Sequence, residues 1–86
     1  MPHHKNKQQA FQAAQQGYEQ AEKANKQRIE AINRADYGKE LGHLTQEVNE
    51  AYQQIDKALS VASEHQEKQL KQYQEKLNQI MSELEE

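Results

Sequence analysis

Apolar residues recur at helical spacing across a very polar chain, and this periodicity predicts the architecture. Steps of three and four separate the members of two stripes, Leu41, Leu44, Val48, Ala51, Ile55, Ala58 and Ala62, followed by Leu70, Tyr73, Leu77, Ile80 and Leu84. Two apolar positions in seven form a narrow seam on one side of a helix, whereas a half-buried strand would alternate. The pattern predicts an all-α, antiparallel helical bundle.

The first predicted helix spans residues 7–35. Its stripe is less apolar than the other two and consists of Phe11, Ala14, Tyr18, Ala21, Ile29, Ile32 and Ala35. Gly17 lies in the interior of this segment, where glycine costs about 1 kcal/mol relative to alanine. We expect the helix to tolerate this glycine, with a close crossing of another helix as the alternative reason for its presence.

The first turn is predicted at residues 36–42, because two glycines lie there. Gly38 can adopt the left-handed conformation that ends a helix, and Gly42 is a second weak point. A short connection of this kind reverses the chain into an antiparallel partner. The second helix is predicted at about 43–60, and its start is left open between Lys39 and Gln46.

A second turn is predicted at residues 60–63. The heptad pattern slips by one position there, because Gln69 occupies the place of the next apolar residue and Leu70 follows it. Ser63 and Gln66 match a capping box, which predicts a third helix at about 64–85. The alternative is one helix of about 45 residues with a stutter in its seam. That long helical hairpin would form a four-helix dimer.

The chain is expected to be one helical domain over residues 7–86, preceded by a flexible tail at 1–6. It has 86 residues, 29% of them charged and 34% hydrophobic, and no cysteine, which excludes disulfides and thiolate chemistry. No apolar run approaches the roughly 18 residues of a membrane span, and no signal-peptide core is present at the start. We therefore expect a cytoplasmic protein without a membrane partner.

Residues capable of catalysis or metal binding are few and scattered. His3 and His4 are adjacent in the predicted tail, His65 stands near the second turn, and Glu40 to His43 form one Glu-x-x-His pair. A di-iron bundle needs two such pairs, and we find neither a phosphate-binding loop nor a nucleophile elbow. The sequence therefore predicts no catalytic, cofactor-binding or metal-binding residues and a protein that is not an enzyme.

Charge is distributed unevenly between the two halves of the chain. Residues 1–39 carry seven Lys/Arg and four acids, whereas residues 40–86 carry four Lys and ten acids. Six of the seven basic residues of the first half make weak nucleic-acid binding an alternative function: Lys5, Lys7, Lys23, Lys26, Arg28 and Arg34. A phosphate-binding surface usually has denser Lys/Arg clusters and a basic domain, so nucleic acid is not the expected partner.

Three segments carry a resemblance to a known group of proteins. They are Tyr18-Glu19-Gln20-Ala21-Glu22, Glu50-Ala51-Tyr52, and Ser63 to Leu70 leading into Gln72 to Leu77. With them the chain resembles small helical proteins of unknown function from Bacillus-type bacteria, over roughly residues 15–85. The resemblance implies a bacterial cytosolic protein and assigns no site residues. The apolar seams and the lack of site residues lead us to expect a structural or protein–protein interaction module that binds itself, as a homodimer, or another protein helix.

Overall fold

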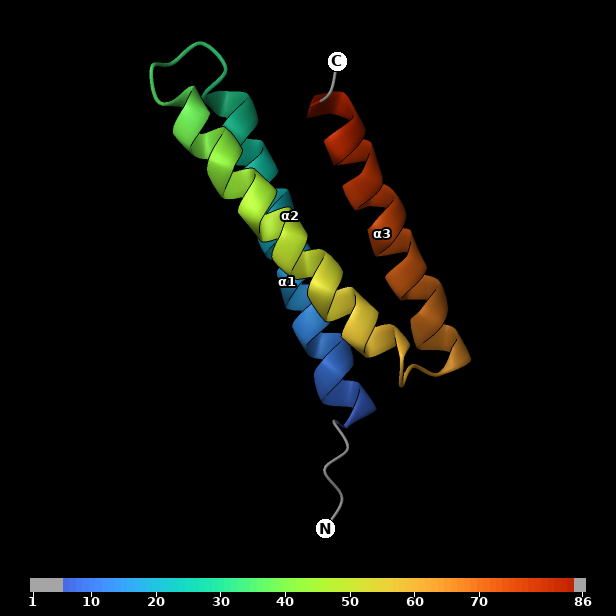
Figure 1. Cartoon of the computed structure of the whole chain (residues 1–86). Helices are drawn as coiled ribbons and strands as arrows, with labels where there is room; N and C mark the ends of the chain where they lie inside the picture. Colours follow the sequence, from blue (N-terminus) through green and yellow to red (C-terminus); the bar gives the residue numbers. More distant parts are fainter. Residues whose placement is uncertain (1–5, 85–86) are drawn as a thin grey trace.

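The computed structural model describes residues 6–84 and is an elongated, all-α bundle of three helices (Figure 1). The helices are α1 (Lys7–Glu30), α2 (Tyr37–Leu59) and α3 (Glu64–Leu84). Each helix reverses the direction of the one before it, so α1 and α3 run in the same direction (Figure 1). The predicted fold class is confirmed. Of the tail predicted at 1–6, only Asn6 lies within the described residues. It caps α1 by accepting a hydrogen bond from the Gln8 amide at 2.8 Å.

Helices α1 and α2 form a tight hairpin because the seam of α1 is made of small residues. Ala10, Ala14, Ala21, Ala24 and Ala31 are all at most 4% exposed. Gly17 continues their 3-4 spacing and lies so near α2 that a Cβ atom on it would be 3.2 Å from the Cα of Ala51. Larger side chains on α2, including Leu44, Val48 and Ile55, are fully buried opposite this seam. Small residues on one helix let the two backbones approach while the other helix fills the space.

Helix α3 packs across the hairpin through large side chains. Leu70 and Leu77 are fully buried, and Tyr73 stacks on Tyr18 with a distance of 4.4 Å between ring centroids. Phe11 lies 6.5 Å from Tyr73, and a hydrogen bond from the Tyr52 hydroxyl to Asn78 Oδ1 joins α2 to α3. The bundle therefore has two kinds of interface, a small-residue one within the hairpin and an aromatic and leucine-rich one beneath α3.

The first turn lies earlier than the sequence predicts. Helix α1 ends at Glu30 rather than near residue 35, and α2 begins at Tyr37 rather than near 43, so the predicted turn at 36–42 is wrong. Gly38 and Gly42 lie inside α2, and no described glycine has a positive φ. The chain reverses over residues 31–36 through short backbone hydrogen bonds, such as Arg34 N–H to the Ala31 carbonyl at 2.9 Å. No left-handed residue is needed there.

The second turn is where the capping box predicts it. The Gln66 amide donates to Ser63 Oγ at 3.3 Å, and the Ser63 amide donates to Gln66 Oε1 at 3.2 Å. Each side chain satisfies a backbone N–H that the helix itself leaves unpaired. The third helix is thus confirmed from Glu64 to Leu84, and the chain turns before it rather than forming one continuous helix.

Candidate interaction surface

The end of the hairpin near the first turn carries two exposed isoleucines, which we name the tip surface. Ile29 is 49% exposed and Ile32 is 52% exposed. Among the described residues 6–84, these two are the exposed large apolar side chains. The Ile32 amide donates to the Ile29 carbonyl at 3.3 Å, so the two residues belong to the same final turn. Two neighbouring apolar side chains on so polar a protein form a candidate contact site.

The tip surface continues the stripe of α1 that α3 covers. Within α1, Phe11, Tyr18, Asn25 and Ile29 follow one another at intervals of seven, seven and four residues, which places them along one side of the helix, and Ile32 follows in the turn. Helix α3 packs on the first two of these positions and then diverges from the hairpin toward its own C-terminal end (Figure 1). The stripe is therefore covered at one end of the bundle and open at the other.

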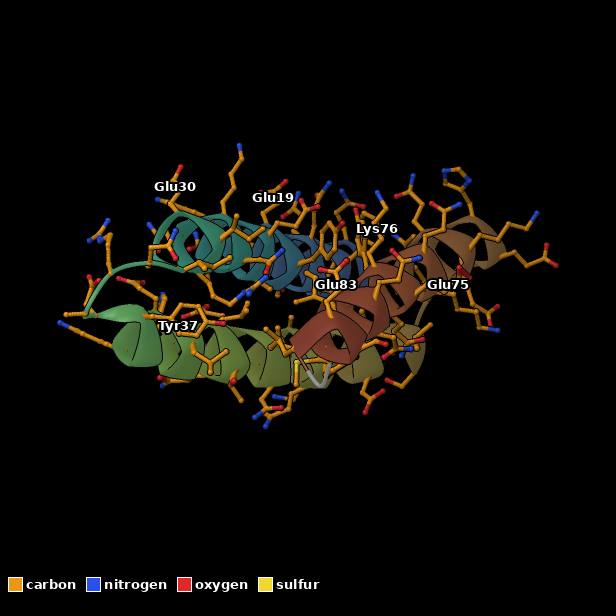
Figure 2. The ribbon with its side chains drawn as sticks, turned by 90° about the horizontal axis from the view of Figure 1, so that it is seen from above. Glu19, Glu30, Tyr37, Glu75, Lys76 and Glu83 are labelled. Carbon is orange, nitrogen blue, oxygen red and sulfur yellow. The ribbon has the colours of Figure 1, made fainter. Side chains whose placement is uncertain are left out.

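A buried arginine fixes the backbone beneath the tip surface. Arg28 occupies a seam position of α1 and is 8% exposed. Its Nη1 donates to the Tyr37 hydroxyl at 3.3 Å and its Nε donates to Asn25 Oδ1 at 3.2 Å. Figure 2 shows Tyr37 at the start of α2, on the side that faces α1. The bond to Tyr37 joins the end of α1 to the start of α2. It therefore holds together the two ends of the turn that carries the tip surface.

A groove of mixed charge lies between α1 and α3, toward the same end of the bundle. Its walls are Glu22, Lys23, Asn25 and Lys26 from α1 and Lys76, Gln79, Ile80 and Glu83 from α3. Figure 2 shows Lys76 and Glu83, which both line this groove, on α3. Three lysines alternate with two glutamates here, which leaves little net charge for attracting a polyanion.

A second groove, between α1 and α2, is polar and acidic. It is lined by Ala13, Gln16, Gly17, Glu19, Gln20, Glu47, Glu50, Gln53 and Gln54. The close approach of the two helices at Gly17 and Ala51 makes this groove shallow. Its amide and carboxylate side chains are long and solvated, so it has the character of an ordinary helix surface.

Two tyrosines have raised pKa values, buried Tyr18 and partly buried Tyr52. Burial is the main cause for Tyr18, and the Glu22 carboxylate adds to the rise because it accepts the Tyr18 hydroxyl hydrogen bond at 2.7 Å and repels a phenolate. Burial also raises the pKa of Tyr52. The Tyr18 ring stacks on Tyr73 and the Tyr52 hydroxyl is bonded to Asn78, so both tyrosines help to hold α3 in place.

The histidines and carboxylates do not gather into a site. His43 and His65 are exposed on different helices, and no three His, Asp or Glu side chains within residues 6–84 lie close enough to share a metal ion. His3 and His4 fall outside the described residues. The single Glu-x-x-His pair, Glu40 and His43, lies on the first turns of α2 with no second pair beside it.

The basic residues behind the alternative nucleic-acid hypothesis are dispersed. Arg28 is buried, and Arg34 is paired with Asp36 through an N–O distance of 2.9 Å. Lys23 and Lys26 share their groove with two glutamates. Lys5 falls outside the described residues. These placements leave few free cations on one face for contact with a phosphate backbone.

The small-residue seam of α1 is the feature that sequence reasoning missed. The predicted stripe contained Ala14 and Ala21 but also Phe11 and Tyr18, which lie beside the seam and face α3. The steps of four, three, four and three that separate Ala10, Ala14, Gly17, Ala21 and Ala24, followed seven residues later by Ala31, would have revealed it. Alanine is common in helices for other reasons, so this spacing is easily overlooked.

Comparison with models of known families, with curated proteins and with solved structures finds no match to this chain. Within residues 6–84, none of the helices combines the length and the apolar character that crossing a bilayer requires. The function must therefore be argued from the surface of the bundle.

Proposed function

We propose that this protein is a non-enzymatic interaction module that presents the tip surface to a partner protein. The observation that carries the proposal is the exposure of Ile29 and Ile32, at about half of each side chain, beside a turn braced by Arg28 and Tyr37. Burying two such side chains in a partner would contribute about 25 cal/mol for each Å² of apolar surface removed from water.

The partner that suits this surface is itself an amphipathic helix or a shallow apolar pocket. Ile29 lies in line with the stripe of α1 on which α3 packs, and Ile32 follows it in the turn, so a partner helix can continue the same mode of packing beyond the end of α3. Recognition through a few apolar anchors on one helix face is a recurrent mode of binding between proteins. A weak nucleic-acid function has less support, because two of the basic side chains of α1 and the following turn are already engaged.

The experiment compares wild type with the double variant Ile29→Ser/Ile32→Ser and with Glu19→Ser/Gln20→Ser as a matched control on the polar side of α1. Each protein is immobilised and exposed to an extract of the cells that naturally make it. The proposal predicts at least one protein that wild type and control retain and the isoleucine variant loses. Surface changes of this kind alter stability by about 0.5 kcal/mol or less, so the melting temperatures should agree. Identical retention by all three proteins would refute the proposal.

A further inference from the structure

We infer that α3 exchanges between two copies of this chain, with the turn at residues 60–63 straightening so that α2 and α3 become one helix. The α3 of each copy then covers the α1–α2 hairpin of the other. This inference is independent of the tip surface and rests on the turn and on the two kinds of interface in the bundle.

The turn contains nothing that forbids a helix. Its residues are Ser60, Val61, Ala62 and Ser63, without glycine or proline, and none of them has a positive φ. Ser60 already has helical backbone angles, with φ of −65° and ψ of −19°. Val61 and Ala62 donate to the carbonyls three residues before them, at 3.2 and 3.4 Å. Helical backbone angles at Val61, Ala62 and Ser63 would therefore be enough to continue α2 into α3.

The capping box is what holds the turn closed. The reciprocal bonds between Ser63 and Gln66 satisfy the amides that a continuous helix would satisfy by itself. Removing the serine hydroxyl breaks the bond to the Gln66 amide in the closed form, in which residues 60–63 turn. It removes no such bond from the open form, in which α2 and α3 are one helix. The balance between the two forms therefore depends on one side-chain pair.

The covering helix can come from either copy. Tyr73, which stacks on Tyr18, and Leu70 and Leu77, which are fully buried, all belong to α3 and require only a hairpin beneath them. The hairpin needs a cover as well, because without α3 the ring of Tyr18, now 6% exposed, would face water. Exchange preserves both sets of contacts, which is why swapping an identical element is a low-cost route to a dimer.

The seams remain compatible with a straight helix. Ala58, Ala62, Gln66, Leu70 and Tyr73 are separated by steps of four, four, four and three, which keeps them near one side of a continuous helix. Leu59 and Val61, now only partly buried at the turn, would meet their counterparts near the two-fold axis. A helix from Tyr37 to Leu84 would be about 70 Å long. The two tip surfaces would then lie at opposite ends of a rod.

Two substitutions shift the equilibrium in opposite directions. Ser63→Ala removes the cap and favours the straight helix, and a typical N-cap loss corresponds to about fivefold per chain, or about twenty-five-fold in the dimer dissociation constant. Glu64→Pro places proline at the first position of α3, which the closed form accepts and a continuous helix does not. Ser82→Ala is the control, because it makes the same chemical change on the exposed side of α3.

The test refolds each full-length protein at low and high concentration and measures its mass by light scattering after size exclusion. Spin labels on Asn49→Cys and Ser82→Cys then report the distance within one chain, in samples diluted with unlabelled protein. The closed form places these residues at the same level of the bundle, as the Tyr52–Asn78 bond shows. A continuous helix separates them by about 50 Å.

The inference predicts a dimer after refolding at high concentration, with the long distance inside each chain. The dimer fraction should rise in Ser63→Ala, stay unchanged in Ser82→Ala and vanish in Glu64→Pro, whose melting curve shows whether the monomer folds. A dimer with the short distance within each chain would overturn the inference. Wild type and Ser63→Ala that both remain monomers at every concentration would overturn it too, whatever the proline variant does.

Discussion

Gly17 offers the sharpest test of the small-residue seam, because a second glycine of the same chain is its natural control. A Cβ atom at position 17 would lie 3.2 Å from the Cα of Ala51, which is tighter than the ordinary contact of 3.4–4 Å. At Gly42, also inside a helix, a Cβ atom would meet nothing within 4 Å. Replacing glycine by alanine inside a helix gains about 1 kcal/mol from backbone preference alone.

The two alanine variants should therefore differ. Gly42→Ala should stabilise the protein by about 1 kcal/mol, which raises the melting temperature by about 4–8 °C in a domain of this size. Gly17→Ala should gain clearly less, because the backbone of α2 must move by a few tenths of an ångström. Gly17→Leu should destabilise by about 1–3 kcal/mol, the usual cost of an overpacked core. Thermal and urea unfolding followed by circular dichroism measure all three. Equal stabilisation by Gly17→Ala and Gly42→Ala, together with no loss of stability in Gly17→Leu, would refute the close approach of α1 and α2 at Gly17.

Three further predictions concern the core. Leu77→Ala should cost about 2–5 kcal/mol in urea unfolding, since the side chain is fully buried; an unchanged midpoint would show that α3 is packed differently. Wild type should lose stability as the pH rises above about 10, because the pKa of Tyr18 is raised in the folded state and the unfolded chain gives up the proton first. Tyr18→Phe should flatten this decline in melting temperature between pH 9 and 11, and an equally steep decline would contradict the argument. Arg28→Leu should destabilise by about 1–2 kcal/mol in chemical unfolding, because the Tyr37 hydroxyl and Asn25 Oδ1 lose the guanidinium that bonds them; an unchanged midpoint would show that these bonds do not brace the first turn.

Helices α2 and α3 could be predicted from the sequence, because large apolar residues recur along them. The stripes of α2 and α3 contain leucine, isoleucine and valine at regular spacing, so their burial follows directly, as at Leu44, Ile55, Leu70 and Leu77. The capping box at Ser63 also located the second turn, because its two hydrogen bonds depend only on residues three apart. Both signals are local and strong.

The first turn and the seam of α1 depend on tertiary contacts and were harder to predict. Gly38 suggested a helix end, but glycine only permits a left-handed residue and does not require one. The actual turn closes through the bonds of Arg34 to Asp36 and of Arg28 to Tyr37, and the spacing of apolar residues does not predict these contacts. The importance of Gly17 depends on Ala51, which lies on another helix. The exposure of the tip surface likewise depends on a tertiary feature, the point at which α3 diverges from the α1–α2 hairpin.

The most direct test of the proposed function is photo-cross-linking from the tip surface. A photoreactive phenylalanine analogue replaces Ile32 in one variant and Glu75, an exposed polar position on α3 (Figure 2), in the control. Both proteins are irradiated in cells that naturally make the chain. The account predicts discrete cross-linked species from position 32 and none from position 75. The same products from both positions, or none from position 32, would contradict an interaction through the tip surface.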